Sequence, residues 1–429
     1  MKRPTLNDRQ RNWIDWLMQV IYTTLRLFVR NGLQNHAAAT AFYFMLSATP
    51  LILILSYGLS VLTRLAEQSN LAGILLGALH AQLHIEFLHD TGFIPREARF
   101  AAGGVSLITL LLASRGLLNA IRAAFVVIFP SDAKRRLVVS ATLPFLIIPL
   151  AFALVVLAGL AKVALNQLAE LELLGALTTH LLDILSSAVG ILILWGLIFA
   201  AYWRLPIRPP APRDTAVLAA LSTLSLLVLT ELFGRLLRIE NYQAIYGALG
   251  GVVFVLIGAF AAWLIFYFWA QCLFALSKVD VAALERLFLG GGQEGANRLE
   301  SYVFARSNRL LDKYGRTFAA GEPLIHEGES GVDAYFLYSG QVGLYHTVHG
   351  NDIPLGNLKE GELFGEMAYL LGEKRTATAV AETDVVVLVL PPRILEDLMR
   401  FSAPLSRRII GTLCKRLQRM NLAIPGESQ

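Results

Sequence analysis

A carboxylate and a guanidinium lie within one short segment near the C-terminus of the chain. Gly365 precedes an apolar run that predicts a short helix, and the free N–H groups at the start of a helix bind anions. Glu366 can accept a hydrogen bond from a ribose hydroxyl, and Arg375 can hold a phosphate through two parallel hydrogen bonds. Held together, these three residues suit a ribose that carries a singly charged cyclic phosphate.

The segment around them resembles the phosphate-binding cassette of the cyclic nucleotide-binding domain family. The matching residues run from Phe364-Gly365-Glu366-Met367-Ala368 to Arg375-Thr376-Ala377. The likeness covers residues 315–425 and includes the Ser339-Gly340 turn expected of a β-roll. It implies a domain that binds cAMP or cGMP as its ligand, and no cofactor.

The resemblance also implies a role for each residue of the cassette. Glu366 would bind the 2′-hydroxyl of the ribose, and Arg375 would bind the cyclic phosphate. Thr376 stands where members that accept cGMP carry a hydroxyl, and Lys374 replaces the usual proline. The nucleotide-binding set is therefore Gly365, Glu366, Met367, Ala368, Arg375, Thr376 and Ala377.

Strands and helices around the cassette must position these side chains. Alternating apolar residues predict strands at 335–337, 342–345 and 385–390, separated by glycine-containing turns. From Ile394 to Leu417, apolar residues recur at helical spacing. The sequence of residues 300–429 therefore predicts a small antiparallel β-domain with C-terminal helices. Too few residues follow Leu417 for a helix-turn-helix, so no nucleic acid is expected as a partner.

The rest of the chain is too apolar for a soluble protein. Of the 429 residues, 55% belong to the hydrophobic set and only 16% are charged, whereas soluble domains carry about 25% charged residues. A helix needs about 20 apolar residues to cross a bilayer core. Stretches with few or no charges predict six transmembrane helices, at residues 37–63, 100–129, 137–161, 184–203, 215–237 and 241–277.

Lys and Arg are concentrated in alternate loops of this part of the chain. Residues 2–30, 134–136 and 204–213 are basic, whereas the other loops are acidic or mixed. Six spans with this alternation place both termini in the cytoplasm. The predicted organisation is a cytoplasmic N-terminal arm at 1–35, a membrane domain at 36–278, a linker at 279–312 and the nucleotide-binding domain at 313–425.

Three segments of the predicted membrane domain carry a likeness to a known family, namely residues 37–50, 113–121 and 242–251. On these segments, residues 30–278 resemble the YihY/BrkB family of bacterial inner-membrane proteins, once labelled ribonuclease BN. The resemblance implies a multi-pass protein of the bacterial inner membrane whose biochemical activity is unassigned. The family often ends its last span with Gly-Ala-Glu, but this chain has Trp269-Ala270-Gln271, so an intramembrane acid is missing.

A few residues of the predicted spans are candidates for a special role. Ionisable groups inside spans are costly and usually face an interior, so an interior pairing of Arg115 with Glu231 is a hypothesis. Pro50 can kink the first span, and Gly247 with Gly251 forms a small-xxx-small pair that suits helix packing. The membrane-domain candidates are Pro50, Arg115, Glu231, Tyr246, Gly247 and Gly251.

No set of residues predicts catalysis or metal binding. His80 and His84 lie one helical turn apart but lack a third ligand in register. Two distant cysteines, Cys272 and Cys414, make neither a disulfide framework nor a zinc site. Metal-dependent nucleases need clustered carboxylates, whereas the acids of the cytoplasmic loops are isolated among arginines. We therefore expect no enzyme, no catalytic residue and no metal.

Two functions remain. The leading hypothesis is a transporter or permease of unknown substrate, whose membrane domain a cyclic nucleotide biases between two states. The alternative is a non-transporting scaffold or signalling protein with a degenerate β-roll, which could form a homo-oligomer. A cation channel is disfavoured, because a T-V-G-Y-G filter and a voltage-sensing helix are both missing. The expected partners are the lipid bilayer and the nucleotide, and a fragment of residues 297–429 is expected to fold and bind it.

Overall fold

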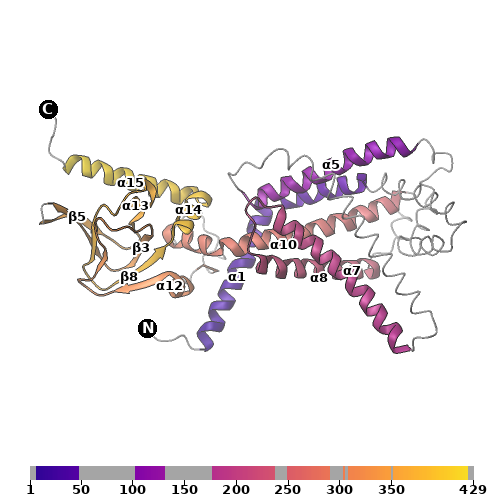
Figure 1. Cartoon of the computed structure of the whole chain (residues 1–429), viewed down its shortest axis with the longest axis horizontal. Coiled ribbons are helices and arrows are strands. Elements are labelled where there is room, and N and C mark those ends of the chain that lie inside the picture. Colours follow the sequence, from indigo (N-terminus) through magenta and orange to yellow (C-terminus); the bar gives the residue numbers. More distant parts are fainter. Residues whose placement is uncertain are drawn as a thin grey trace, which may run out of the picture. The chain divides into compact units, whose positions relative to one another are not determined.

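A computed structural model describes residues 6–47, 102–130, 176–236, 249–289, 303–304, 308–348 and 351–423 (Figure 1). The chain divides into two compact units. The first comprises Thr24–Phe274, and the second joins Met1–Thr23 to Ala275–Gln429. The predicted span at 137–161 and the residues Pro50, His80, His84, Tyr246 and Gly247 lie outside the described residues.

Long helices make up the described part of the first unit. They are the end of α1 (Leu6–Arg30), residues 33–47, α5 (Ala102–Ile128), α7 (Ala176–Arg204), α8 (Pro212–Leu236) and the first part of α10 (Gly250–Leu289). Among the described helices, three are long and apolar enough to cross a membrane, with candidate spans at Ser187–Arg204, Pro212–Arg235 and Gly250–Phe288. Apolar helices of membrane type are thus confirmed, and the count of six stays a prediction.

Buried hydroxyl groups join the helices of this unit. The Tyr202 hydroxyl of α7 donates to the Phe266 carbonyl of α10 at 2.7 Å, and it lies 3.1 Å from the Ser222 hydroxyl of α8. The Tyr267 hydroxyl of α10 lies 2.7 Å from the Thr40 hydroxyl. Helices in a bilayer gain little from apolar contact with one another. Hydrogen bonds of this kind therefore help to hold the bundle together.

Two residues of the family-like motifs have packing roles. A Cβ atom at Gly116 of α5 would lie 2.5 Å from the ring of Tyr43, so only glycine lets α5 approach residues 33–47 this closely. Gln271, which stands where the resemblance leads one to expect an acid, is fully buried in α10. Its side-chain oxygen accepts a hydrogen bond from the Asn31 amide at 3.0 Å.

The hypothesis that Arg115 pairs with Glu231 is wrong. The Glu231 carboxylate accepts a hydrogen bond from the Arg235 guanidinium, 3.0 Å away and one turn further along α8. Both of these side chains are largely exposed, and Arg115 is exposed on α5. Residues four apart on a helix meet without any tertiary contact, and long charged side chains extend toward the bilayer interface. The remaining described candidate, Gly251, is half-buried in the first turn of α10.

A pair of antiparallel sheets forms most of the described part of the second unit. The strands are β1 (Gly315–Phe318), β2 (Pro323–Ile325), β3 (Ala334–Ser339), β4 (Val342–Val348), β5 (Asn351–Leu358), β6 (Leu363–Phe364), β7 (Thr378–Ala381) and β8 (Val385–Leu390). Their orders are β1-β8-β3-β6 and β2-β7-β4-β5. The accompanying helices are α12 (Asn308–Tyr314), α13 (Glu366–Leu371), α14 (Pro392–Phe401) and α15 (Ala403–Ala423). The predicted antiparallel β-domain with C-terminal helices is confirmed.

Apolar side chains from the two sheets share one core. Leu337, Phe364 and Val387 contribute to it from the first sheet, and Val342 contributes from the second. The β3–β4 turn depends on Gly340, which has φ +95°. A Cβ atom there would lie 2.6 Å from a backbone oxygen of the neighbouring turn, so the tight connection requires glycine.

The C-terminal end of α10 belongs to a second apolar cluster of this unit. Val281, Leu284 and Phe288 recur at helical spacing and are buried. They pack with residues of β3, β8, α14 and α15, and the ring centres of Phe288 and Phe336 are 4.2 Å apart. Residues 279–289 were expected to be part of a linker, but they are helical and belong to the domain core. The glycine-rich run that suggested a linker begins only where α10 ends.

Candidate functional site

Two left-handed glycines bracket the short helix of the cassette. Gly365 precedes α13 with φ +75°, and Gly372 follows it with φ +71°, a region that residues with side chains rarely adopt. The Gly372 N–H donates to the Ala368 carbonyl and so ends the helix. The chain is therefore turned sharply on both sides of α13, which directs the segment with Arg375 back toward Gly365.

Arg375 is held against this turn. Its Nη1 atom donates to the Gly365 carbonyl at 2.5 Å, and its Nη2 atom donates to the Asp333 carbonyl at 2.8 Å. The guanidinium carbon lies 5.7 Å from the centre of the Tyr335 ring. A Cβ atom at Gly365 would lie 2.8 Å from Nη1, so glycine is needed for this approach as well as for the turn.

The loop between β2 and β3 packs around Arg375. The Arg375 N–H donates to the Glu329 carbonyl at 3.1 Å, and the Arg375 carbonyl accepts from the Gly328 N–H at 2.9 Å. A Cβ atom at Gly331 would lie 2.9 Å from Nη2. The sequence interpretation missed Asp333 and Gly331, because the first acts through its main chain and the second by lacking a side chain. The closely spaced glycines of this loop were the available signal.

The Arg375 side chain is a buried charge with neutral acceptors. It is only 6% exposed, and within the described ranges no carboxylate lies at salt-bridge distance from it. Buried charges in proteins are normally paired with an opposite charge. The site is therefore suited to an anion, and a phosphate matches the planar fork of a guanidinium.

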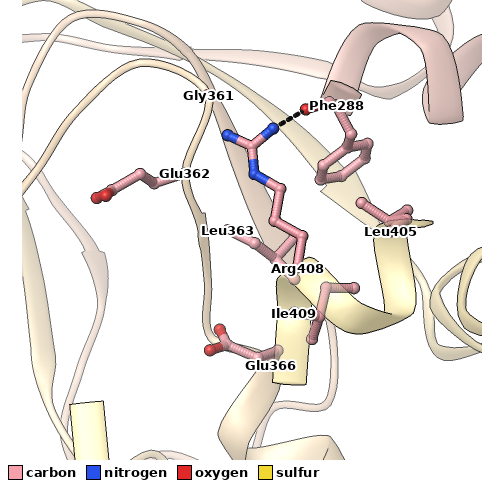
Figure 2. A pocket seen from close by; sticks show the side chains of 8 residues that line it. All are labelled: Phe288, Gly361, Glu362, Leu363, Glu366, Leu405, Arg408 and Ile409. Carbon is pink, nitrogen blue, oxygen red and sulfur yellow. Dashed lines mark hydrogen bonds between the residues drawn. The ribbon is translucent and has the colours of Figure 1, made fainter. Parts of the chain in front are cut away.

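Glu366, the first residue of α13, lies in a small pocket lined by residues of α10, α13 and α15 and by residues 361–363 at the start of β6. The pocket has a volume of about 80 Å³, and Glu366 is 1% exposed. Figure 2 shows Arg408 of α15 reaching Phe288 at the end of α10, where its Nη1 atom donates to the Phe288 carbonyl, with Glu366 at the opposite end of the pocket. A water molecule occupies about 30 Å³ in the liquid. The pocket therefore has room for a few waters.

The other predicted residues surround the same turn. Met367 and Ala377 are half-buried, Ala368 is buried, and Thr376 is exposed directly after Arg375. The structure thus brings Gly365 into contact with Arg375 and leaves the Thr376 hydroxyl open to a ligand.

A further contact connects the cassette to the C-terminal helices. The Tyr369 hydroxyl of α13 donates to the Glu396 carboxylate of α14. This hydrogen bond to the charged carboxylate raises the pKa of the Tyr369 hydroxyl above its ordinary value. A movement of α13 would therefore change this contact with α14.

Comparison with known proteins assigns both parts of the chain to families. The family described as Virulence factor BrkB matches residues 24–286. The family described as Cyclic nucleotide-binding domain matches residues 315–401. Both resemblances inferred from the sequence are confirmed.

Individual relatives match only part of the chain. The Cyclic AMP receptor protein of Thermus thermophilus is 33% identical over 110 residues, which are 25% of this chain and 51% of that protein. The cAMP-dependent protein kinase regulatory subunit of Aspergillus niger is 38% identical over 109 residues, 24% of this chain and 26% of that protein. The cGMP-dependent protein kinase 2 of Homo sapiens is 37% identical over 73 residues, 16% of this chain and 10% of that protein. The chain therefore spans about half or less of the length of these relatives.

Among solved structures, the crystal structure of Thermus thermophilus Catabolite Activator Protein aligns over 30% of this chain and 59% of that chain. The aligned residues are 29% identical, and the TM-score is 0.26.

Proposed function

The chain belongs to the Virulence factor BrkB family, and from that premise we propose that it is a bacterial inner-membrane transporter or permease regulated by a cyclic nucleotide. Both termini lie in the cytoplasm, where the C-terminal domain binds cAMP or cGMP. The membrane domain moves a solute or a lipid. We assign it no catalytic reaction, because the acids of its cytoplasmic loops are isolated in the sequence and metal-dependent hydrolysis needs them clustered.

The observation that carries nucleotide binding is the buried guanidinium of Arg375 beside the Gly365 turn. Its two acceptors are neutral carbonyls, so a singly charged cyclic phosphate would supply the opposite charge. A guanidinium has five N–H donors, and the two bonds to protein carbonyls leave donors for a ligand. Glu366 follows Gly365 directly and is the acceptor proposed for the ribose hydroxyl.

The relatives' names support a purine nucleotide as the ligand. Two of the proteins compared above are named for cAMP and one for cGMP. The exposed hydroxyl of Thr376 is the group proposed to contact a guanine base. Thr376→Ala should therefore lower the affinity for cGMP more than the affinity for cAMP.

Regulation of the membrane domain is supported by the length of α10. This single helix carries a candidate span and ends among the core residues of the nucleotide-binding domain. Within the second unit, Lys278 of α10 binds Asp397 of α14 at 2.5 Å. Asp280 binds both Arg309 and Lys313 at 2.6 Å. A ligand that changes the packing of α14 would therefore act on α10 and bias the states of the helix bundle.

A membrane scaffold with an inactive β-roll is the second candidate, and one observation favours it. Both terminal nitrogens of Arg375 already donate to main-chain carbonyls. The turn at Gly365 is therefore held by hydrogen bonds within the protein. This is expected of a domain that only docks or dimerises and binds no ligand there.

Flux measurements in proteoliposomes test the transport proposal. A mixture of labelled solutes is presented to the wild-type protein with and without cAMP, and the same is done with Arg375→Ala. We expect a nucleotide-dependent flux that the substitution abolishes. Nucleotide binding without any nucleotide-dependent flux of a solute or a lipid would favour the scaffold.

A further inference from the structure

Helix α1 has one face that is covered by protein. Gln19 is 3% exposed, and its amide nitrogen donates to the Val303 carbonyl at 3.3 Å while its oxygen accepts from Arg309 at 3.4 Å. The rings of Tyr22 and Phe304 meet edge to face, with centres 6.1 Å apart. These contacts lie within the second unit and occupy one side of the helix.

A different face of α1 carries an apolar stripe that no described residue covers. Ile14, Met18, Ile21, Leu25 and Val29 are spaced by three or four residues, which places them on one side of a helix. The exposed fractions are 50% for Ile14, 47% for Ile21, 51% for Leu25 and 68% for Val29, and Met18 is half-buried. We call these five residues the α1 stripe.

The charged residues of α1 are mostly basic. The helix contains four arginines, Arg9, Arg11, Arg26 and Arg30, and two aspartates, Asp8 and Asp15, which gives a net charge of +2. Asp15, Gln19, Arg26 and Arg30 follow one another at helical spacing on a face away from the stripe. A helix with this division suits the surface of a bilayer rather than its interior. In agreement, α1 is not among the described helices that are apolar enough to span a membrane.

We propose that the α1 stripe binds the cytoplasmic surface of the bilayer, with acyl chains against its apolar residues and anionic headgroups near its arginines. Exposed apolar residues continue beyond the turn at 31–32, with Phe42 58% and Leu46 50% exposed. Those two residues lie in the part that matches a membrane-protein family, whereas Ile14 and Ile21 precede it. The lipid-facing surface thus extends along the chain into the N-terminal arm.

This arrangement gives α1 two partners. Arg309, which binds Gln19, also binds Asp280 of α10 at 2.6 Å. The helix proposed to lie on the membrane surface and α10 are therefore connected through Arg309. The proposal rests on the inner-membrane location and cytoplasmic N-terminus, and it does not depend on nucleotide binding.

Site-directed spin labelling of the full chain tests this contact. Cys272 and Cys414 are replaced by alanine and serine, and a nitroxide is attached at Ile14→Cys, at Ile21→Cys or, as the matched control on the polar face, at Arg26→Cys. The protein is placed in vesicles of phosphatidylcholine with or without phosphatidylglycerol. Collisions with oxygen, which concentrates in lipid, are compared with collisions with a water-soluble nickel complex.

The labels at positions 14 and 21 should lie roughly 5–10 Å below the headgroup boundary, as for interfacial helices, and the label at 26 should stay in water. Removal of phosphatidylglycerol should raise the nickel collisions at 14 and 21. Equal nickel collisions at all three positions would overturn the proposal, as would spin–spin broadening that is independent of the lipid, which would mean that a second copy of the chain covers the stripe.

Quenching of a tryptophan placed on the α1 stripe provides a check without a spin label. The difference in fluorescence between the wild type and Ile21→Trp isolates the emission of the added tryptophan from that of the native ones. Brominated lipids should quench this difference signal, and a signal that they leave unchanged would contradict a membrane-bound α1.

Discussion

At the scale of single residues, the shape of the Arg375 side chain matters as much as its charge. The planar fork reaches the Gly365 and Asp333 carbonyls at once, and Lys has neither the second nitrogen nor the reach. Arg375→Lys keeps the positive charge but cannot hold a phosphate through two parallel bonds. We expect it to lower the affinity for cAMP by about 10-fold or more, a loss of about 1.4 kcal/mol or more. Calorimetric titration of the full chain in detergent checks this value.

Wild-type affinity in Arg375→Lys would contradict the two-bond contact of the guanidinium with the phosphate. It would mean that charge alone attracts the ligand. The matched control is Arg393→Lys, which changes an exposed arginine of α14 in the same domain. It should leave the affinity unchanged.

Glu366 is expected to recognise the ribose. A hydrogen bond to a charged group contributes about 1.5–3 kcal/mol, so Glu366→Ala should weaken cAMP binding by about 10- to 150-fold. The substitution should also erase the preference for cAMP over its 2′-deoxy analogue. The measurement is a pair of titrations with the two nucleotides on each variant. A preference that survives in Glu366→Ala would assign the ribose contact to another residue.

At the scale of elements, the nucleotide-binding domain begins earlier in the chain than the sequence predicted. A fragment of residues 297–429 lacks Val281, Leu284 and Phe288, which are buried in its core. Each such side chain contributes about 1.5–3 kcal/mol when fully buried, and domains are stable by only about 5–15 kcal/mol. A fragment that starts at residue 275 should therefore fold, and one that starts at 297 should be largely unfolded.

Urea denaturation followed by circular dichroism compares the two fragments. Phe288→Ala in the longer fragment should lower its free energy of unfolding by about 3–5 kcal/mol, and Phe288→Leu should cost less. Equal stability of the two fragments would show that the end of α10 is not part of the folding unit.

The sequence predicted the elements whose signal is local. Residues 385–390 are a short run of apolar, mostly β-branched residues and form β8, and the cassette residues Gly365 and Arg375 do meet. The end of α10 was missed although its apolar residues recur at helical spacing, because a glycine-rich run a few residues later has the composition of a linker. Helical spacing alone does not show whether a helix ends with its membrane span or continues into the next domain.

Interactions that depend on three-dimensional neighbours could not be predicted. The Asp333 carbonyl that binds Arg375 is a main-chain group, and a sequence does not show which carbonyl a side chain will reach. The pairing of Glu231 with Arg235, instead of Arg115, could have been predicted because the two residues are four apart on α8. It was missed because an intramembrane charge suggests a tertiary partner.

At the scale of the whole molecule, the basic loops predict that both termini face the cytoplasm. Single cysteines at Gln68, Gln167 and Gly350 test this topology in intact cells with a membrane-impermeant reagent. The first two should be labelled from the periplasm, because they fall in loops that lack the basic excess. Gly350→Cys lies in the nucleotide-binding domain and should react only after the membrane is opened. Its labelling in intact cells would reverse the orientation.

The central claim is that this membrane protein binds a cyclic nucleotide through Arg375. Isothermal titration calorimetry of the full chain with cAMP and cGMP tests it most directly, using the wild type, Arg375→Ala and the control Arg393→Ala. Removing one partner of a buried charged pair costs about 2–5 kcal/mol, or about 30-fold to several thousand-fold in affinity. We predict that loss for Arg375→Ala and wild-type affinity for Arg393→Ala. A well-folded wild-type protein that binds neither nucleotide at millimolar concentration, or equal affinities for the wild type and Arg375→Ala, would contradict the claim.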